Sequence, residues 1–191
     1  MGGRLPLLDP AAADAAQRRA LDVLEGNFLP WAEKAGFRTR DGDGRLIGPF
    51  NSALYSPELS AAFLDYQASE QQHTTLDPRV REVVILTVGA VWKSAYELYA
   101  HSAVAAKAGL SDAVIAALAD GDTPKALTGE QATAHRLARA LVVERQVGAT
   151  LFAEGEAAFA LRGLVDLVHL VGAYQTVCGL LNAFAIPAPT A

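Results

Sequence analysis

The residues with side chains suited to chemistry gather in one mostly apolar helical stretch, residues 81–110. Ser94, Glu97 and His101 follow one another at intervals of three and four residues, so on an α-helix they share one face. A carboxylate one turn from an imidazole can orient the ring and raise its pKa, which suits proton transfer near neutral pH. Glu97 and His101 are therefore candidate catalytic residues. The alternative is a buried structural pair, because charged groups in apolar surroundings must be paired.

A second carboxylate, Glu82, stands earlier in the same stretch. The chain is expected to change direction near residues 93–94. If the helices before and after this point pack antiparallel, Glu82 approaches His101 and a carboxylate–imidazole–carboxylate cluster results. The simpler alternative is a salt bridge between Glu82 and a neighbouring arginine, Arg79 or Arg81. Glu82 is the third candidate catalytic residue.

Candidates for contacts with a substrate lie in and before the same stretch. Ser94 and Tyr96 offer hydroxyl groups beside the catalytic candidates, although a tyrosine is as often a core residue. Asn51 follows Gly-Pro-Phe in a loop, where turn formation is the commoner role of asparagine. An anionic substrate needs a cation, for which Arg81 and Arg45 are the candidates.

The remaining histidines and the single cysteine are expected to be structural. His73, in a loop, and His135, on a helix surface, are expected to be solvated, and His169 to be a satisfied core or interface residue. Cys178 is most simply a small core residue, and the alternative is a residual redox role. One cysteine excludes an intrachain disulfide, and the sequence has no His-Glu-x-x-His motif. We therefore expect no metal site.

Composition predicts a single domain, residues 1–191, rich in helix. Of its 191 residues 51% are hydrophobic and 19% charged, and alanine, a strong helix former, supplies much of the apolar share. A net charge of −5 without a basic run argues against a nucleic-acid partner. The N-terminus lacks the apolar segment of a signal peptide, and polar residues interrupt the apolar stretch 163–186. We therefore expect a cytoplasmic protein without a membrane span.

Capping signals and glycines set the expected helix boundaries. Residues 10–50 are expected to hold an N-terminal helix and a Gly-rich loop, residues 78–110 the two helices of the central stretch, and residues 187–191 a disordered tail. The expected helices are 10–31 with a break at Pro30, 57–69, 78 to a break between Gly89 and Ser94, 96–107 before Gly109, 111–121, 128–145 after a capping box of Thr128 and Gln131, 151–161, and a last helix from a break at Gly163 to Pro187. A turn at Asp43-Gly44 is expected within the loop 35–50.

The pattern Glu-x11-Ser-x2-Glu-x3-His, from Glu82 to His101, resembles the core motif of the carboxymuconolactone decarboxylase family, which includes the alkyl hydroperoxidase D proteins. Redox members of that family have Glu-x11-Cys-x2-Cys-x3-His, so Ser94 and Glu97 occupy the positions of the two cysteines. Segments on both sides of the motif also look like longer members of the family. The resemblance therefore extends from about Leu5 to Ile186.

The resemblance implies an all-α, alkyl hydroperoxidase D-like fold of about eight helices. It also implies assembly into homotrimers or hexamers, with a pocket near a subunit contact. The N-terminal helix and the Gly-rich loop are additions relative to the short decarboxylases of the family.

The resemblance also narrows the expected activity. Peroxidase members resemble thiol–disulfide enzymes, which need two thiols, and Ser94 and Glu97 supply none. The decarboxylase branch works by acid–base chemistry without a cofactor. We therefore expect a lyase or isomerase acting on a small acidic lactone or unsaturated acid, with His101 as general acid/base, Glu97 orienting it or exchanging protons, and Glu82 completing the relay. The alternatives are a non-catalytic oligomeric binding protein on this fold, or a residual redox protein using Cys178.

Overall fold

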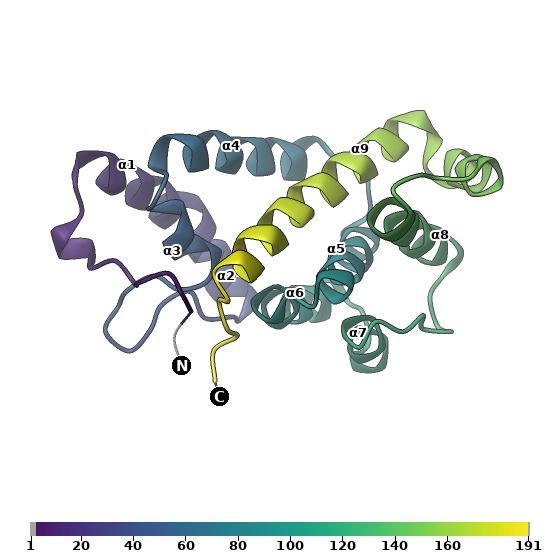
Figure 1. The fold of residues 1–191 in the computed structure, drawn as a ribbon. Helices are drawn as coiled ribbons and strands as arrows, with labels where there is room; N and C mark the ends of the chain where they lie inside the picture. Colours follow the sequence, from purple (N-terminus) through teal and green to yellow (C-terminus); the bar gives the residue numbers. More distant parts are fainter. Residues whose placement is uncertain (1–2, 191) are drawn as a thin grey trace.

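The computed structural model describes residues 3–190, which form α-helices joined by loops and by short 3₁₀ and π turns, with no β-strand in that range (Figure 1). The helices are α1 (Ala15–Val23), α2 (Leu29–Ala35), α3 (Pro49–Ala53), α4 (Pro57–His73), α5 (Pro78–Trp92), α6 (Ala95–Ala108), α7 (Asp112–Ala119), α8 (Gly129–Arg139) and α9 (Ala149–Ala183). The all-α class expected from the sequence is confirmed.

Helix α5 is the centre of the fold. It packs against α6, α8 and α9, and the long helix α9 crosses the molecule beside it (Figure 1). Nine of its residues between Val80 and Gly89 are buried, which is the burial expected of a helix that is apolar on all sides. Glu82 is the one charged residue in this buried run, so its partner must lie inside the protein.

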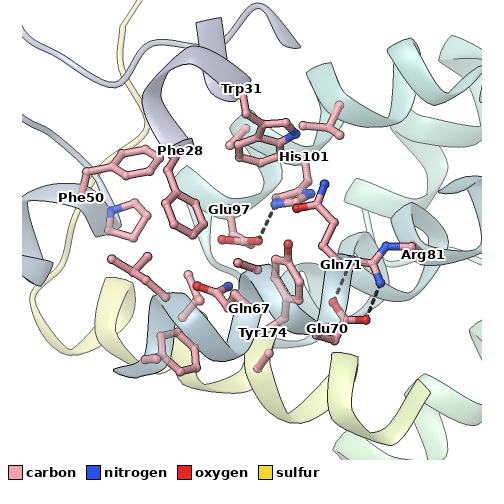
Figure 2. A pocket seen from close by; sticks show the side chains of 18 of the residues that line it. Phe28, Trp31, Phe50, Gln67, Glu70, Gln71, Arg81, Glu97, His101 and Tyr174 are labelled. Carbon is pink, nitrogen blue, oxygen red and sulfur yellow. Dashed lines mark hydrogen bonds and ion pairs between the residues drawn. The ribbon is translucent and has the colours of Figure 1, made fainter. Parts of the chain in front are cut away.

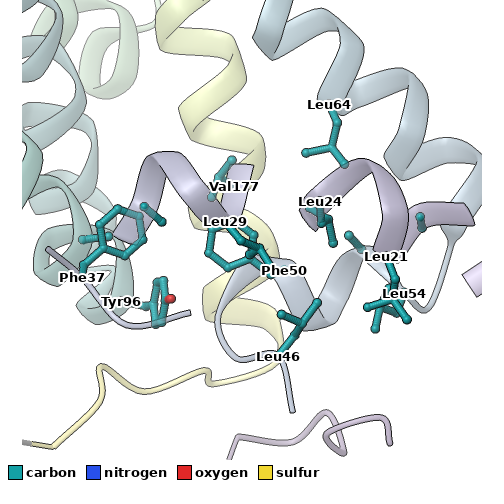
Figure 3. Close-up of a cluster of buried hydrophobic side chains, with 14 of the residues drawn as sticks. Leu21, Leu24, Leu29, Phe37, Leu46, Phe50, Leu54, Leu64, Tyr96 and Val177 are labelled. Atoms are coloured by element: carbon teal, nitrogen blue, oxygen red, sulfur yellow. The ribbon is translucent and has the colours of Figure 1, made fainter. Parts of the chain in front are cut away.

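The N-terminal part forms a second core against the beginning of α6 and the C-terminal part of α9. Figure 3 shows Leu24, Leu29 and Phe50 packed together, with Tyr96 of α6 and Val177 of α9 closing the same cluster. This packing fixes α1 to α4 relative to the central helices. The additional N-terminal segment therefore shares a buried core with α6 and α9.

The expected helix break at Pro30 does not occur. A π turn, Leu24–Phe28, joins α1 to α2, and the Leu29 N–H bonds to the carbonyl of Leu24. Because the wider turn comes immediately before the proline, the ring of Pro30 fits at the start of α2 without ending the helical run.

The reversal between α5 and α6 occurs where the sequence predicts it. Lys93 adopts a left-handed conformation with φ 51°, and Ser94 becomes the N-cap of α6. Gly89, by contrast, remains helical. A Cβ atom on it would lie 3.1 Å from Leu98 Cδ2, so this glycine allows α5 and α6 to pack closely. Gly109, with φ 95°, ends α6 as expected.

The Gly-rich loop is held against α6 by a close contact. The expected turn at Asp43-Gly44 is present, with Gly44 at φ 80°. Gly48 has φ 65°, and a Cβ atom there would lie 2.2 Å from Tyr96 Cζ, so only glycine fits. The short helix α3 follows directly and was not expected.

Several other boundaries differ from expectation. Helix α4 continues to His73, which is therefore helical. Helix α9 is kinked at Ala160, with φ 55°, and not at Gly163. Gly163 is instead a packing residue, since a Cβ there would lie 2.8 Å from Phe159 Cβ. The capping box at Thr128 is confirmed.

Within the described residues one helix, α9, is long and apolar enough to cross a membrane by length and composition. Core helices of soluble proteins meet the same criterion, and 44% of the apolar window of α9 is buried inside the molecule. Its packing against α5 and α8 agrees with the interpretation of the stretch 163–186 as a buried or interface helix.

Candidate active site

The structure brings Glu82, Glu97 and His101 together at the contact of α5 and α6. His101 Nδ1 lies 2.9 Å from Glu82 Oε2, in hydrogen-bonding geometry. On the opposite side of the ring, His101 Nε2 lies 3.3 Å from Glu97 Oε1, but that oxygen has no hydrogen-bond partner among the described residues. The packing of α5 against α6 thus places Glu82 at one ring nitrogen, and the helical spacing within α6 places Glu97 at the other.

Burial and charge both perturb this cluster. All three side chains are less than a tenth exposed. Burial by itself lowers the pKa of His101, but Glu82 and Glu97 outweigh it, and the pKa is raised. Burial raises the pKa of Glu97, and the repulsion from Glu82 adds to this, while His101 opposes it. The cluster therefore retains protons to a higher pH than isolated groups would, and Glu97 and His101 titrate as a coupled pair.

The cluster lies at the wall of a cavity of about 810 Å³. This volume is in the range of pockets that hold small molecules. Figure 2 shows Glu97 and His101 facing into the cavity, opposite aromatic side chains. The aromatic lining consists of Phe28, Trp31, Phe37, Phe50, Phe63, Tyr96 and Tyr174. The cavity is therefore largely apolar, with titratable groups concentrated in one part of its wall.

Two aromatic rings contact the imidazole directly. The Tyr174 ring stands edge-on to His101, with ring centroids 4.9 Å apart and an interplanar angle of 89°. The Trp31 ring lies beside the imidazole in a tilted orientation, with ring centroids 6.2 Å apart. These contacts limit the rotation of His101, so its two nitrogens stay directed at Glu82 and Glu97.

Helix α4 supplies the polar part of the opposite wall. Gln67 and Gln71 line the cavity, and Glu70 forms a two-point ion pair with Arg81 of α5, in which Arg81 Nη2 lies 2.8 Å from Glu70 Oε2. Burial acts to lower the pKa of Arg81, but the pair with Glu70 raises it, so the guanidinium remains charged. Arg81 therefore pairs with Glu70 and not with Glu82.

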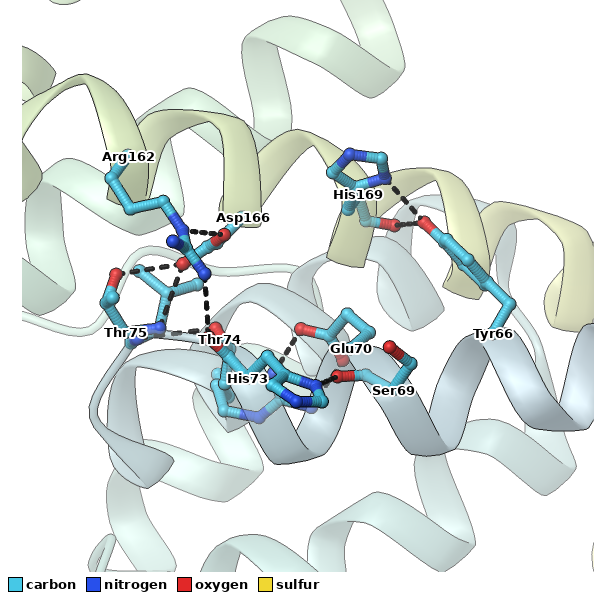
Figure 4. Close-up of polar contacts among 11 residues, drawn as sticks. Tyr66, Ser69, Glu70, His73, Thr74, Thr75, Arg162, Asp166 and His169 are labelled. Carbon is cyan, nitrogen blue, oxygen red and sulfur yellow. Dashed lines mark hydrogen bonds and ion pairs between the residues drawn. The ribbon is translucent and has the colours of Figure 1, made fainter.

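Contacts with α9 hold α4 in place over the cavity (Figure 4). The Tyr66 hydroxyl lies 2.9 Å from His169 Nδ1, and Thr75 donates from its N–H and its hydroxyl to Asp166, both at 2.8 Å. Arg162 donates to the carbonyl of His73, the last residue of α4. The wall formed by α4 is thus anchored at its middle and at its C-terminal end.

Two of the candidates for substrate contact have structural partners. Asn51 is buried outside the cavity lining, where it accepts from the Leu8 N–H and donates to the Pro6 carbonyl. Tyr96 lines the cavity with its ring, but its hydroxyl donates to the Arg38 carbonyl at 2.7 Å. Asn51 and Tyr96 therefore hold the N-terminal part of the chain against the core.

Ser94, Arg45 and Cys178 also lie outside the cavity lining. The Ser94 hydroxyl is fully buried without a hydrogen-bond partner in the described chain. Arg45 forms ion pairs with Asp41 and Asp43 in the Gly-rich loop. Cys178 is a buried core residue, as expected, and burial raises the pKa of its thiol well above its usual range, with Glu97 adding to the rise.

The expectation for His135 is wrong. Its side chain is buried, with Nδ1 2.8 Å from Thr87 Oγ1 and Nε2 3.1 Å from Thr123 Oγ1. The helical pattern of α8 assigned it to the polar face, but α5 packs against that face. His73 is exposed as expected. His169 is exposed, so the core alternative for it is wrong, and the interface alternative stays a prediction.

Gln67, Gln71 and Trp31 were not identified from the sequence. They come from helices that precede the central motif, and only the tertiary packing directs them at it. The spacing of the two glutamines, one helical turn apart, could have marked one face of α4. Within residues 3–190 no group of three His, Cys, Asp or Glu side chains is placed to hold a metal ion.

Comparison with known proteins identifies the central part of the chain. Residues 57–140, which contain α4 to α8, match the model of the carboxymuconolactone decarboxylase family. This segment is a carboxymuconolactone decarboxylase family domain. The family suggested by the spacing from Glu82 to His101 is therefore confirmed. No curated protein matches the chain closely enough to count as a relative.

Solved structures extend the similarity to the whole fold. An uncharacterized peroxidase-related protein from Silicibacter sp. TM1040 matches with a TM-score of 0.74 at 15% identity, over 99% of this chain and 94% of that one. An alkylhydroperoxidase AhpD core protein from Ralstonia eutropha JMP134 matches with a TM-score of 0.71 at 16% identity, over 98% and 92%. The debrominase Bmp8, in complex with 2,3,4-tribromopyrrole, matches with a TM-score of 0.73 at 13% identity, over 100% and 94%. The fold is thus alkyl hydroperoxidase D-like, including the N-terminal segment.

Proposed function

We propose that this protein is a cofactor-free lyase or isomerase that transfers protons within a small unsaturated substrate. The observation that carries the proposal is the Glu82–His101–Glu97 cluster, buried at the wall of a cavity large enough for a small molecule. A buried pair with raised pKa values can both accept and return a proton near neutral pH. The family assignment supports an enzymatic role.

Each residue of the cluster has a distinct role in this proposal. Glu82 accepts the hydrogen bond from His101 Nδ1 and so fixes the orientation and tautomer of the ring. Glu97 and His101 Nε2 share the proton that is exchanged with the substrate carbon, because the two groups lie 3.3 Å apart and both residues line the cavity. A cluster of purely structural carboxylates has no need of an adjoining cavity.

The absence of a dithiol separates this function from that of a thiol peroxidase. Ser94 and Glu97 stand at the two motif positions, and the buried Cys178 thiol has a raised pKa that keeps it protonated. Thiolate chemistry therefore has no suitable nucleophile in the described chain.

Deuterium incorporation across a panel of candidate substrates tests the proposal. The protein is incubated in D₂O with small lactones, unsaturated acids and unsaturated ketones, and mass spectrometry detects carbon-bound deuterium. We expect incorporation into at least one compound with the wild type, and incorporation at a strongly reduced rate with His101→Ala. Equal incorporation by both proteins, or none by the wild type across the panel, would contradict the proposal and favour a binding protein.

We also propose that the protein is a homo-oligomer. Leu161, Val165 and Val168 form an apolar row on α9 and are 58%, 53% and 53% exposed. Such an apolar row on one exposed face of a helix is typical of a contact between protein copies. Light scattering of the wild type and of Val165→Glu tests this proposal: the wild type should be a trimer or hexamer and the variant smaller.

A further inference from the structure

The charged groups in the cavity lining are paired with one another around the reacting centre. Arg81 is bonded at two points to Glu70, and the imidazole of His101 lies between Glu82 and Glu97. An anion brought to His101 would therefore face two carboxylates and would find no unpaired cation beside it. Burial of an unpaired charge is strongly unfavourable, so this arrangement selects against a carboxylate at the reacting centre.

The remaining cation of the lining, Lys107, lies at the rim. It is exposed, and it follows His101 by six residues on α6. With a rise of about 1.5 Å per residue, this separation is roughly 9 Å along the helix axis. Lys107 can interact with a group at the cavity mouth, but it does not compensate a charge next to His101.

Neutral hydrogen-bonding groups, by contrast, surround the centre. No hydrogen bond joins the Tyr174 hydroxyl to another residue of the described chain, and Figure 2 shows this hydroxyl directed into the cavity near Glu97 and His101. Gln67 and Gln71 face the same space from α4. Burial raises the pKa of Tyr174 well above its usual range, with Glu97 and Glu82 adding to the rise, so the group stays a neutral donor.

We propose that the substrate is an uncharged, mainly apolar carbonyl compound with a ring-sized unsaturated or aromatic body, whose carbonyl oxygen accepts a hydrogen bond from Tyr174. This inference rests on the proposed function and specifies its substrate class. The aromatic wall holds the body of the compound, and Tyr174 directs the carbon next to the carbonyl towards Glu97 and His101. The acidic lactone expected from the family resemblance is the alternative outcome of the test.

The chemistry of such a substrate needs no further reactant. The Glu97–His101 pair removes a proton from the carbon next to the carbonyl, and the electron pair of the C–H bond moves into the carbonyl group. The resulting enolate oxygen keeps the hydrogen bond from Tyr174. The proton on the pair exchanges with solvent, and a proton is then delivered to the far carbon of a C=C bond conjugated with the enolate. This restores the carbonyl, shifts the C=C bond and gives the isomer, so that atoms and electrons balance.

A matched pair of ligands tests the charge preference on the wild-type protein. Acetophenone and benzoate share a ring and a carbonyl carbon, but only benzoate is charged at pH 8. Calorimetric titration should show acetophenone binding about tenfold or more tightly than benzoate. The reason is that only benzoate brings a negative charge without a partner next to the carboxylates. Equal or tighter binding of benzoate, or no binding of acetophenone, overturns the inference.

Two variants locate the effect within the cavity. Tyr174→Phe should weaken acetophenone binding about threefold to tenfold, the loss expected for one hydrogen bond. The matched control is Tyr55→Phe, because the Tyr55 hydroxyl bonds to the Pro6 carbonyl away from the lining. Glu70→Gln should increase benzoate affinity by unpairing Arg81. Unchanged acetophenone affinity in Tyr174→Phe removes the role assigned to Tyr174, whether or not Glu70→Gln folds.

This inference and the proposed function fail separately. A preference for acetophenone without any deuterium exchange across the panel contradicts proton transfer and leaves the ligand class standing. Exchange that is confined to carboxylate substrates contradicts the ligand class and leaves proton transfer standing.

Discussion

Two buried histidines on either side of α5 show how the same side chain takes opposite electrostatic roles. His101 lies between Glu82 and Glu97, and its pKa is raised. His135 lies between the hydroxyls of Thr87 and Thr123, and its pKa is lowered by burial, with Arg139 contributing. Both rings are buried and have a polar group within 3.3 Å of each nitrogen, so burial alone does not separate them. The charge of the partners decides which histidine holds a proton near neutral pH.

The surroundings of the two histidines differ as well. His101 borders the large, aromatic-walled cavity, whereas His135 lies in the contact between α5 and α8 beside a smaller and more open hollow. His101 therefore combines a retained proton with access to a small molecule. His135 is best described as a neutral residue that joins the two helices through the threonine hydroxyls.

The largest contrast is expected in activity. His101→Ala should lower the rate of deuterium exchange into a substrate by about 10²–10⁴-fold, the usual contribution of a general acid/base. His135→Gln, which keeps a hydrogen-bonding side chain at the other site, should leave the rate per folded molecule unchanged. Mass spectrometry of the exchanged substrate measures both, and circular dichroism checks that each variant is folded. A loss of similar size in both variants would abolish the distinction between the two histidines.

The next effect is expected in the titration of the two rings. By NMR, His101 should titrate above its ordinary pKa of 6.5 and His135 below it. Glu82→Gln should lower the pKa of His101, because it removes the hydrogen-bonded carboxylate, and should leave His135 unaffected. If His101 titrated at the same pH in the variant and the wild type, Glu82 would not be the group that holds its proton.

The same shifts predict the dependence of stability on pH. The folded-state pKa values of His101 and Glu97 are raised, so their stabilising contribution is complete below the unfolded values of 6.5 and 4.5 and is lost as the pH rises through the folded values. The folded-state pKa of His135 is lowered, so its contribution is present above 6.5 and is lost as the pH falls.

Urea unfolding measured across this pH range checks both signs. Glu82→Gln should flatten the loss of stability on the alkaline side, because it lowers the pKa of both His101 and Glu97. His135→Gln should flatten the loss on the acidic side. Each variant serves as the control for the other, and an exchange of the two effects would reverse the assignment.

The smallest effect is expected at Cys178, a third buried titratable group, which packs beside Ser94 at the start of α6. Cys178→Ala should leave deuterium exchange unchanged and cost about 1 kcal/mol of stability for a small cavity. The native thiol should react with a disulfide reagent far more slowly than the thiol of the unfolded protein. Rapid reaction of the folded protein would restore the redox alternative.

Much of the fold followed from local signals in the sequence. The cap at Thr128, the stop at Gly109 and the reversal at Lys93–Ser94 depend on side chains that bond to their own helix ends or on backbone that only certain residues adopt. Such signals act within a few residues of a helix end and do not depend on tertiary contacts. The boundaries that were wrong, at Pro30 and Gly163, depend instead on what packs against those residues.

The site divides in the same way. The approach of Glu82 to His101 was foreseeable, because motif spacing and one antiparallel reversal bring them together. The pairing of Arg81 with Glu70 could not be foreseen. It joins α4 and α5, and no sequence spacing indicates that these two helices pack together at this point. His135 was assigned to the surface for the same reason, since its burial depends on α5.

The sequence by itself thus determined the helical class, the family of the central segment, and a motif without the two thiols of a peroxidase. These properties depend on residue types and short spacings, and these determine local helix structure without long-range contacts. Only the tertiary structure decided the character of the cavity: the aromatic wall to which α2, α3, α4, α6 and α9 contribute, the pairing of Arg81, and the hydroxyl of Tyr174 that bonds to no other described residue. Cavity chemistry depends on which faces of distant helices meet, and burial against those faces, not sequence neighbours, sets the charge that each group carries.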